Sequence, residues 1–254
     1  MSFTIPGVEH VYPFELLVNL GYIPRVTSIY KFGYNDDVDS GVEEDLWDYG
    51  GMYTYSTTAD IDSISSSSAL DTQDILIYGL DANWEQVEQI VTLQGQTKVT
   101  LTTPLIRVWR MINIGTTNLA GNVYLYVDGT ISGGIPTVAN TIRAFIEDGN
   151  NQTLMLLYTV PSGYTAHVRR VTASLGGLVA GYGTFKFWAR PYGRVFSLKG
   201  IIDLSSDGTS VHEALFQEWL AFPEKTDFRV SCLVNANNMK VSGSADIYLT
   251  KNED

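Results

Sequence analysis

The side chains best suited to metal binding or nucleophilic catalysis are three histidines and one cysteine, His10, His167, His212 and Cys232. The histidines are far apart in the sequence and form no HxH or HExxH pattern, the spacings that place two imidazoles on one zinc ion. Cys232 lies in an apolar run, which is typical of a buried strand cysteine rather than a reactive thiolate. As the single cysteine, it cannot form a disulfide within the chain.

Motifs that bind a cofactor or activate a hydroxyl group are missing from the sequence. There is no GxSxG elbow, no GxGxxG before a helix and no GxxxxGK[ST] phosphate loop. Acidic residues are numerous, but no pair is singled out for glycoside hydrolysis by its spacing. We therefore predict no catalytic, cofactor-binding or metal-binding residues, no cofactor and no enzymatic activity.

Acidic residues accumulate between residues 36 and 48 with no basic residue among them. They are Asp36, Asp37, Asp39, Glu43, Glu44, Asp45 and Asp48. Carboxylates at alternate positions can bind calcium, but the EF-hand spacing fails here. Counted from Asn35, the sixth position is Ser40 rather than glycine and the twelfth is Leu46 rather than glutamate. We predict a solvated acidic loop, with calcium binding as the alternative.

The next segment is dense in aromatic residues beside glycines: Trp47, Tyr49, Tyr53 and Tyr55. Such a cluster can stack on sugars. It can equally form an aromatic plug at one end of a sandwich, or a contact between subunits. We favour the plug or the contact, and keep glycan binding as the alternative.

Composition indicates a β-rich protein that does not bind nucleic acid. Charged residues make up 17% of the chain, against about 25% in average soluble proteins, and aromatic residues make up 12%. Aromatic and β-branched residues suit pleated sheets. The formal net charge is −12 and there is no basic run, so a phosphate backbone would be repelled. The N-terminus lacks a signal-peptide pattern and no window is apolar over about 20 residues. We therefore expect a protein that is made and kept in a cytoplasm, or leaves it by a route other than secretion, and that has no membrane partner.

Residues 74–111 are expected to form the central part of the fold. A short apolar run at 74–78, a turn, and an alternating segment at 84–93 form a hairpin signature. Two further strands are expected at 98–102 and 105–114. We predict that these four successive strands share one antiparallel sheet.

The rest of the chain continues with short strands and glycine-containing turns, which predicts an all-β fold with antiparallel sandwich or jelly-roll packing. We expect one or two sandwiches, with an extended arm at 1–40, a first sandwich at 41–135 and a second at 136–254. Residues 14–20 could form one or two helical turns within the arm. Residues 211–222 fit a helix or a strand, and we favour the strand.

Several segments resemble uncharacterised virion structural proteins of tailed bacteriophages. They are Arg25–Gly41, Trp47–Gly51, Gly79–Trp84 and Tyr158–Thr165. The likeness runs from about residue 25 to the end and consists of short motifs. It implies a component of the virus particle, in the head or the tail, and brings no functional residue with it.

The resemblance and the composition together predict a capsid decoration or cement protein. We expect it to form a homotrimer and to bind the major capsid protein or other virion proteins, because a symmetric lattice repeats a weak contact many times. The alternative is a tail-associated module that recognises host glycans through the aromatic residues at 47–55.

Overall fold

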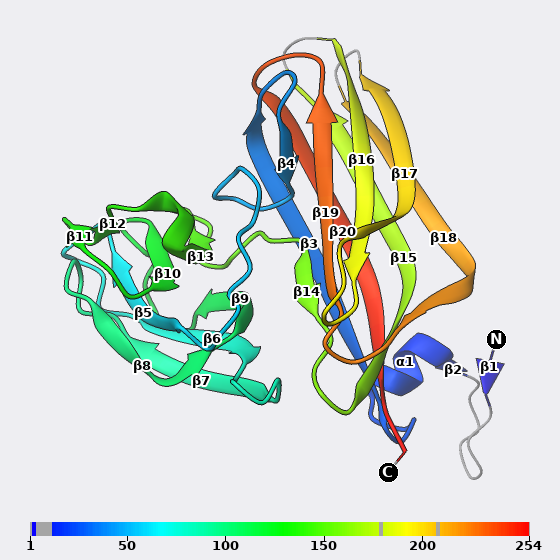
Figure 1. The fold of residues 1–254 in the computed structure, drawn as a ribbon, viewed down its shortest axis with the longest axis horizontal. Helices are drawn as coiled ribbons and strands as arrows, with labels where there is room; N and C mark the ends of the chain where they lie inside the picture. The colour runs from blue at the N-terminus through cyan, green and yellow to red at the C-terminus, as the bar shows by residue number, and fades with distance from the viewer. Residues whose placement is uncertain (1, 4–11, 178–179, 207–208, 254) are drawn as a thin grey trace.

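The computed structural model describes residues 2–3, 12–177, 180–206 and 209–253. Within these ranges the chain is almost entirely β, and neighbouring strands of the sheets are antiparallel. The strands form a larger and a smaller sandwich that lie side by side (Figure 1). The predicted all-β class with antiparallel sandwiches is thereby confirmed.

The larger sandwich combines strands from both ends of the chain. Its first sheet has the order β18-β15-β20-β3, formed by Thr209–Phe222, Tyr164–Gly176, Met239–Lys251 and Val26–Val38. Its second sheet has the order β14-β19-β16-β17, formed by Leu157–Thr159, Asp227–Val234, Gly181–Arg190 and Ser197–Ser206. The short strand β4 (Glu43–Asp45) also pairs with β19.

The smaller sandwich is inserted between β4 and β14 of the larger one. One sheet has the order β13-β10-β5-β8, formed by Ile142–Ile146, Val123–Val127, Ile61–Ser66 and Val99–Leu105. The other has the order β7-β6-β9, formed by Gln86–Thr92, Asp74–Leu80 and Arg107–Asn113. A small hairpin, β11 (Ile131–Ser132) and β12 (Ile135–Pro136), and a 3-10 turn at Ala139–Thr141 precede β13.

The N-terminal segment holds the α-helix of the described residues, α1 (Phe14–Asn19), which follows the short paired strands β1 (Ser2–Phe3) and β2 (Tyr12–Pro13). Glu15 lies in its first turn, where a carboxylate is favourable to the helix dipole. Gly21, at a φ of +75°, ends it. Neither this helix nor any other helical turn in the described ranges is long and apolar enough to cross a membrane.

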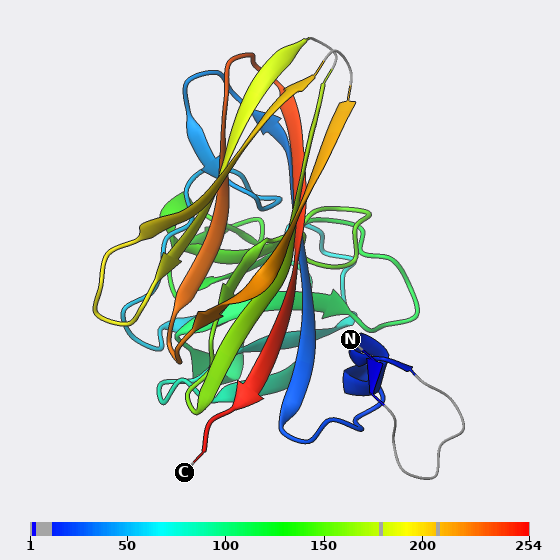
Figure 2. The same ribbon diagram turned by 90° about the vertical axis from the view of Figure 1, so that its right-hand side faces the viewer.

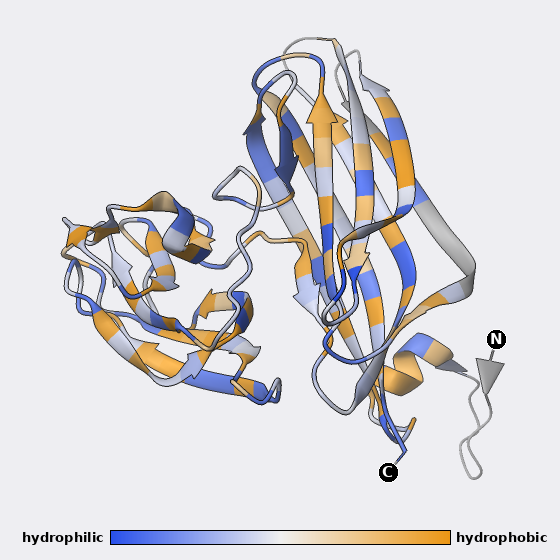
Figure 3. Ribbon diagram, in the orientation of Figure 1, coloured by the Kyte–Doolittle hydropathy of each residue, from blue (hydrophilic) through white to orange (hydrophobic). Residues whose placement is uncertain are grey.

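Each sandwich encloses its own core, and burial alternates along many strands of the larger sandwich. In β16 the odd-numbered residues from Gly181 to Ala189 are buried and the even-numbered ones are not. Figure 3 shows the resulting alternation of apolar and polar residues along the strands of the larger sandwich. The largest fully buried side chains include Phe185 in the larger sandwich and Ile61 and Met111 in the smaller one.

Predictions that depend on local pairing are confirmed. Strands β6 and β7 form the predicted hairpin, with Asp74 opposite Thr92. Residues 209–222 form strand β18, as favoured for 211–222. Residues 14–19 form α1, the alternative to a fully extended arm at this point. The prediction of one sheet with four successive strands was wrong. The third strand, β8, pairs with β5 in the opposite sheet, and β9 pairs with the other edge of β6.

The predicted division into 1–40, 41–135 and 136–254 differs from the structure at each boundary. Residues 26–38, placed in the arm, form β3 and pair with β20. Strand β4, placed in the first sandwich, pairs with β19 of the larger sandwich. Strand β13, placed in the second, pairs with β10 of the smaller one. The first two pairings join segments remote in sequence, and turn signals and periodicity carry no information about them.

Candidate functional site

The residues first considered for chemistry are spread over the larger sandwich. His167 on β15 is half-buried beside Thr250, and His212 on β18 is exposed, while His10 lies outside the described residues. Cys232 on β19 is fully buried, and burial raises the pKa of its thiol to about 12. In the ranges that the structure describes, no three His, Cys, Asp or Glu side chains gather where they could hold a metal ion.

The acidic segment is only partly the solvated loop that we predicted. Asp36, Asp37 and Asp39 are exposed, but Asp45 is fully buried on β4 and paired with Arg229, with the nitrogen and oxygen 3.1 Å apart. Glu43 pairs with Lys186 at 2.6 Å. The prediction of a solvated loop fails for β4, because Lys186 of β16 and Arg229 of β19 form ion pairs with its carboxylates.

The aromatic cluster points mainly inward. Trp47 and Tyr53 are buried in the core of the smaller sandwich, with their rings 5.2 Å apart. Tyr49 packs edge-on against Phe145 at 5.4 Å. This packing favours the aromatic plug and leaves Trp47 and Tyr53 unable to stack on a glycan. Tyr55 continues the cluster towards the junction of the two sandwiches.

A buried ionic network joins the two sandwiches, and it is centred on Asp227 of β19. Arg107 of β9 donates to Asp227 from Nε at 2.8 Å and from Nη2 at 3.1 Å. Arg190 of β16 donates from Nη2 at 2.6 Å and from Nε at 3.0 Å. The Thr159 hydroxyl of β14 donates at 2.7 Å. Asp227 and Arg107 are almost fully buried, so this network fixes one sandwich against the other.

Aromatic rings cover the guanidinium groups of this network. The Arg107 guanidinium lies 4.9 Å from the ring centre of Trp84 and 5.1 Å from that of Tyr55. Arg190 lies 4.6 Å from Tyr55 and 4.5 Å from Phe196. Rings at these distances attract the cations and hold them in position.

A cleft of about 320 Å³ opens to solvent beside this network, and we call it the interface cleft. It is lined by Tyr55, Ser56, Thr57, Trp84, Arg107, Arg190, Tyr192, Gly193, Arg194 and Asp227. The cleft could not be found from the sequence because its residues come from five separate segments. The one available signal was Arg107, a charged residue inside an apolar run.

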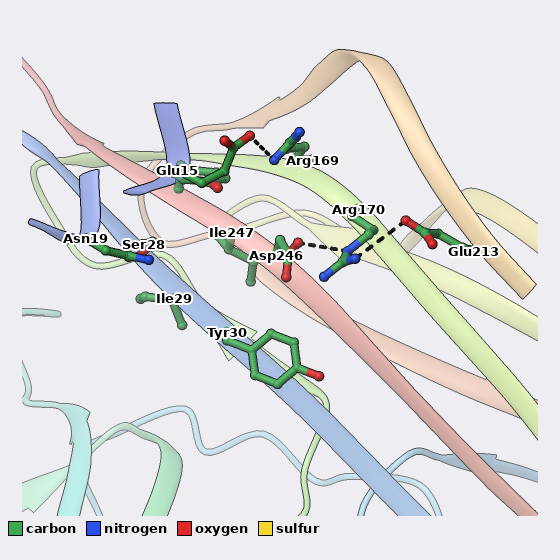
Figure 4. A pocket seen from close by; sticks show the side chains of 11 residues that line it. Glu15, Asn19, Ser28, Ile29, Tyr30, Arg169, Arg170, Glu213, Asp246 and Ile247 are labelled. Atoms are coloured by element: carbon green, nitrogen blue, oxygen red, sulfur yellow. Dashed lines mark hydrogen bonds and ion pairs between the residues drawn. The ribbon is translucent and has the colours of Figure 1, made fainter. Parts of the chain in front are cut away.

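A larger hollow of about 430 Å³, which we call the outer cleft, lies where α1 covers the β18-β15-β20-β3 sheet (Figure 4). Arg169 pairs with Glu15 of the helix. Arg170 pairs with Asp246 at 2.8 Å and with Glu213 at 3.5 Å. Because its charges are paired with one another, the outer cleft mainly fastens the N-terminal helix to the sheet.

On the side of the larger sandwich away from the smaller one, the sheets end in the edge strands β17 and β18, and Figure 2 shows this side facing the viewer. Each is the last strand of its sheet. Large apolar side chains are exposed on or beside them: Val195 (82%), Leu198 (42%), Ile201 (53%) and Val211 (71%). We call these four residues and the two strands the open edge. Edge strands with exposed apolar residues are a template for association with another chain.

Two buried ionisable groups, Lys31 and Asp48, lie near the junction of the two sandwiches. Lys31 of β3 donates to the backbone carbonyl of Trp109, and burial, assisted by Arg110, holds its pKa well below the ordinary value. Burial raises the pKa of Asp48 from 3.8 to about 7. One oxygen of Asp48 accepts from the Leu154 amide at 3.1 Å, and the other has no hydrogen-bond partner among the described residues.

The raised pKa of Asp48 makes stability depend on pH. Between these two pKa values the Asp48 carboxyl group is protonated in the folded chain and ionised in the unfolded chain. Its contribution to the free energy of unfolding is therefore complete below pH 3.8 and is lost as the pH rises through about 7. Asp48→Asn cannot titrate. Between pH 5 and pH 8 the wild type should lose about 2 kcal/mol of unfolding free energy relative to this variant. Urea unfolding at both pH values measures the difference, and an unchanged difference would contradict the assignment.

Comparisons with known proteins add little to this description. No protein-family model matches the sequence, and no curated protein matches it. Among solved structures, the chain is similar to a structure of infectious bursal disease virus, Gx strain, with 8% identity, a TM-score of 0.28, and coverage of 89% of this chain and 72% of that one. It is also similar to a mutant VP2 protein of infectious bursal disease virus in derived T=1 particles, with 8% identity, a TM-score of 0.26, and coverage of 96% and 76%. Likenesses this weak support no functional conclusion.

Proposed function

We propose that the chain is a structural protein of a virus particle, and that it decorates the head of a tailed bacteriophage without enzymatic activity. The observation that carries the proposal is the open edge. Two edge strands of 10 and 14 residues lie on one side of the larger sandwich, each with one edge unpaired, together with four exposed apolar side chains. A protein that works alone covers or blunts such edges, whereas a subunit of an assembly buries them against a neighbour.

The neighbours that suit this edge are further copies of the chain and the proteins of the head lattice. We propose a homotrimer that binds the major capsid protein, made in the host cytoplasm and located in the virion. The low charge content and the resemblance to virion proteins support the same reading. The net charge of −12 would limit adhesion to the packaged genome.

Self-association should depend on the open edge. We expect the double variant Ile201→Lys and Val211→Lys to be a monomer where the wild type is a trimer, because two charges would have to be buried without partners. Light scattering after size exclusion measures the mass. The matched control is Leu70→Lys with Ile90→Lys, equally exposed apolar positions on the smaller sandwich at 79% and 59%. A monomeric wild type, or dissociation of the control alone, would contradict the proposal.

The proposed place in the virion is tested by counting copies. Quantitative mass spectrometry of purified particles of the encoding phage should find on the order of hundreds of copies, as lattice symmetry requires. About a dozen copies would instead support the tail-associated host-recognition module. Absence of the chain from mature particles would rule out both.

A further inference from the structure

The interface cleft carries more positive than negative charge in a chain that is acidic overall. Three arginines, Arg107, Arg190 and Arg194, line it, and Asp227 is its single acidic lining residue. Asp227 is shared between Arg107 and Arg190. The exposed Arg194 side chain forms no ion pair or hydrogen bond with the rest of the described residues. The lining therefore has a net charge of +2 and can accept an anion.

Several hydrogen-bond donors at the cleft are not used by the fold. Arg190 contacts Asp227 through Nε and Nη2, which leaves its Nη1 without a partner in the described part of the chain. The guanidinium of Arg194 is available in full. The Ser56 hydroxyl oxygen accepts a hydrogen bond from Arg143 Nε at 3.1 Å, so the Ser56 hydroxyl proton is available to a ligand. The neighbouring Thr57 side chain is exposed. Two guanidinium groups and two hydroxyls thus border one hollow.

The aromatic wall of the cleft has the shape of a corner. Trp84 is buried, at 8% exposure, and Tyr192 is 66% exposed, with ring centres 5.4 Å apart and planes at 79°. Two perpendicular rings do not form the parallel slot that sandwiches a flat nucleobase. A corner of this kind fits a non-planar ring that places its C–H face on one aromatic side chain.

We propose that the interface cleft binds a carboxylated sugar, such as a uronate or sialate unit of a surface glycan. Arg194 and Nη1 of Arg190 bind the carboxylate, because the planar guanidinium matches its two oxygens. Tyr192 covers the sugar ring, and Ser56 and Thr57 contact its hydroxyls. The volume of about 320 Å³ lies at the lower end of the range for small-molecule sites, which suits one or two sugar units.

Of the aromatic residues in the glycan alternative, Tyr55 lines this cleft, whereas Trp47 and Tyr53 are buried in the core of the smaller sandwich. The sugar site does not depend on the proposed place in the virion. A decoration protein with such a site would let the particle adhere to acidic glycans on a host or in its surroundings.

Calorimetric titration of the full chain with glucuronate and N-acetylneuraminate tests the proposal, with glucose and uridine monophosphate as comparisons. We expect saturable binding of at least one acidic sugar and no measurable binding of glucose. Arg194→Ala should weaken that binding about tenfold or more, as expected for a charge-assisted hydrogen bond. Tyr192→Ala should also weaken it. Both residues are exposed, so both variants should remain folded.

The charge-matched control is Lys240→Ala, an exposed residue at the end of β20 remote from the cleft, which should bind like the wild type. The proposal is overturned if no acidic sugar binds, if glucose binds equally well, or if uridine monophosphate binds more tightly than both sugars. It is also overturned if Arg194→Ala has no effect, or if Lys240→Ala weakens binding to the same extent.

Discussion

Replacing Asp227 by asparagine is expected to lower the free energy of unfolding by about 3 to 5 kcal/mol. The side chain accepts hydrogen bonds from Arg107, Arg190 and Thr159 at a site where its exposure is 4%. Without the carboxylate, the guanidinium of Arg107, itself 7% exposed, stays buried with no counter-charge. An uncompensated buried charge is among the costliest defects that one substitution can produce.

Thermal and urea unfolding measure this loss, and a chain of this size should lose roughly 2 to 4 °C of Tm per kcal/mol. Asp203→Asn is the matched control. Asp203 is exposed and accepts one hydrogen bond, from the Thr184 hydroxyl at 2.7 Å, so its replacement should cost about 0.5 kcal/mol or less. Equal effects of the two variants would contradict the central role assigned to the Asp227 network.

Replacing Gly33 by alanine should be similarly damaging, with an expected loss of about 3 kcal/mol or more. A Cβ atom at this position would lie 2.2 Å from the carbonyl oxygen of Leu46 and 2.5 Å from the amide nitrogen of Leu156. These two backbone groups form a hydrogen bond of 2.8 Å. It links the two connections between the sandwiches, so the added methyl group would push them apart.

Gly200→Ala is the matched control, because Gly200 also lies in a strand of the larger sandwich but has no atom within 4 Å of the position that an added methyl group would take. It should be neutral or slightly stabilising, since alanine restricts the unfolded chain. Chemical denaturation of both variants gives the comparison. A Gly33→Ala protein as stable as the Gly200→Ala protein would show that the two connections are not held together at this point.

The sequence was informative wherever the structure depends on neighbouring residues. The hairpin at 74–92 could be predicted because its apolar face and its turn lie within one segment. Strand β18 could be favoured because the chain runs on from it directly into β19. The all-β class follows from composition and from repeated turn signals.

The insertion of one sandwich into the other could not be predicted, because it depends on pairing between remote strands. Strand β3 pairs with β20 from the opposite end of the chain, and periodicity gives no partner for either. The ion pair of Arg107 and Asp227 joins residues 120 positions apart. The acidic strand β4 resembled a solvated loop for the same reason, since Lys186 and Arg229 come from distant strands.

The most direct test of the proposed role is a cryo-electron microscopy reconstruction of the virus particle that contains this chain. We expect copies on the head surface, with the open edge of β17 and β18 buried against a neighbouring subunit. Copies whose open edge faces solvent throughout, or a position confined to the tail, would contradict it.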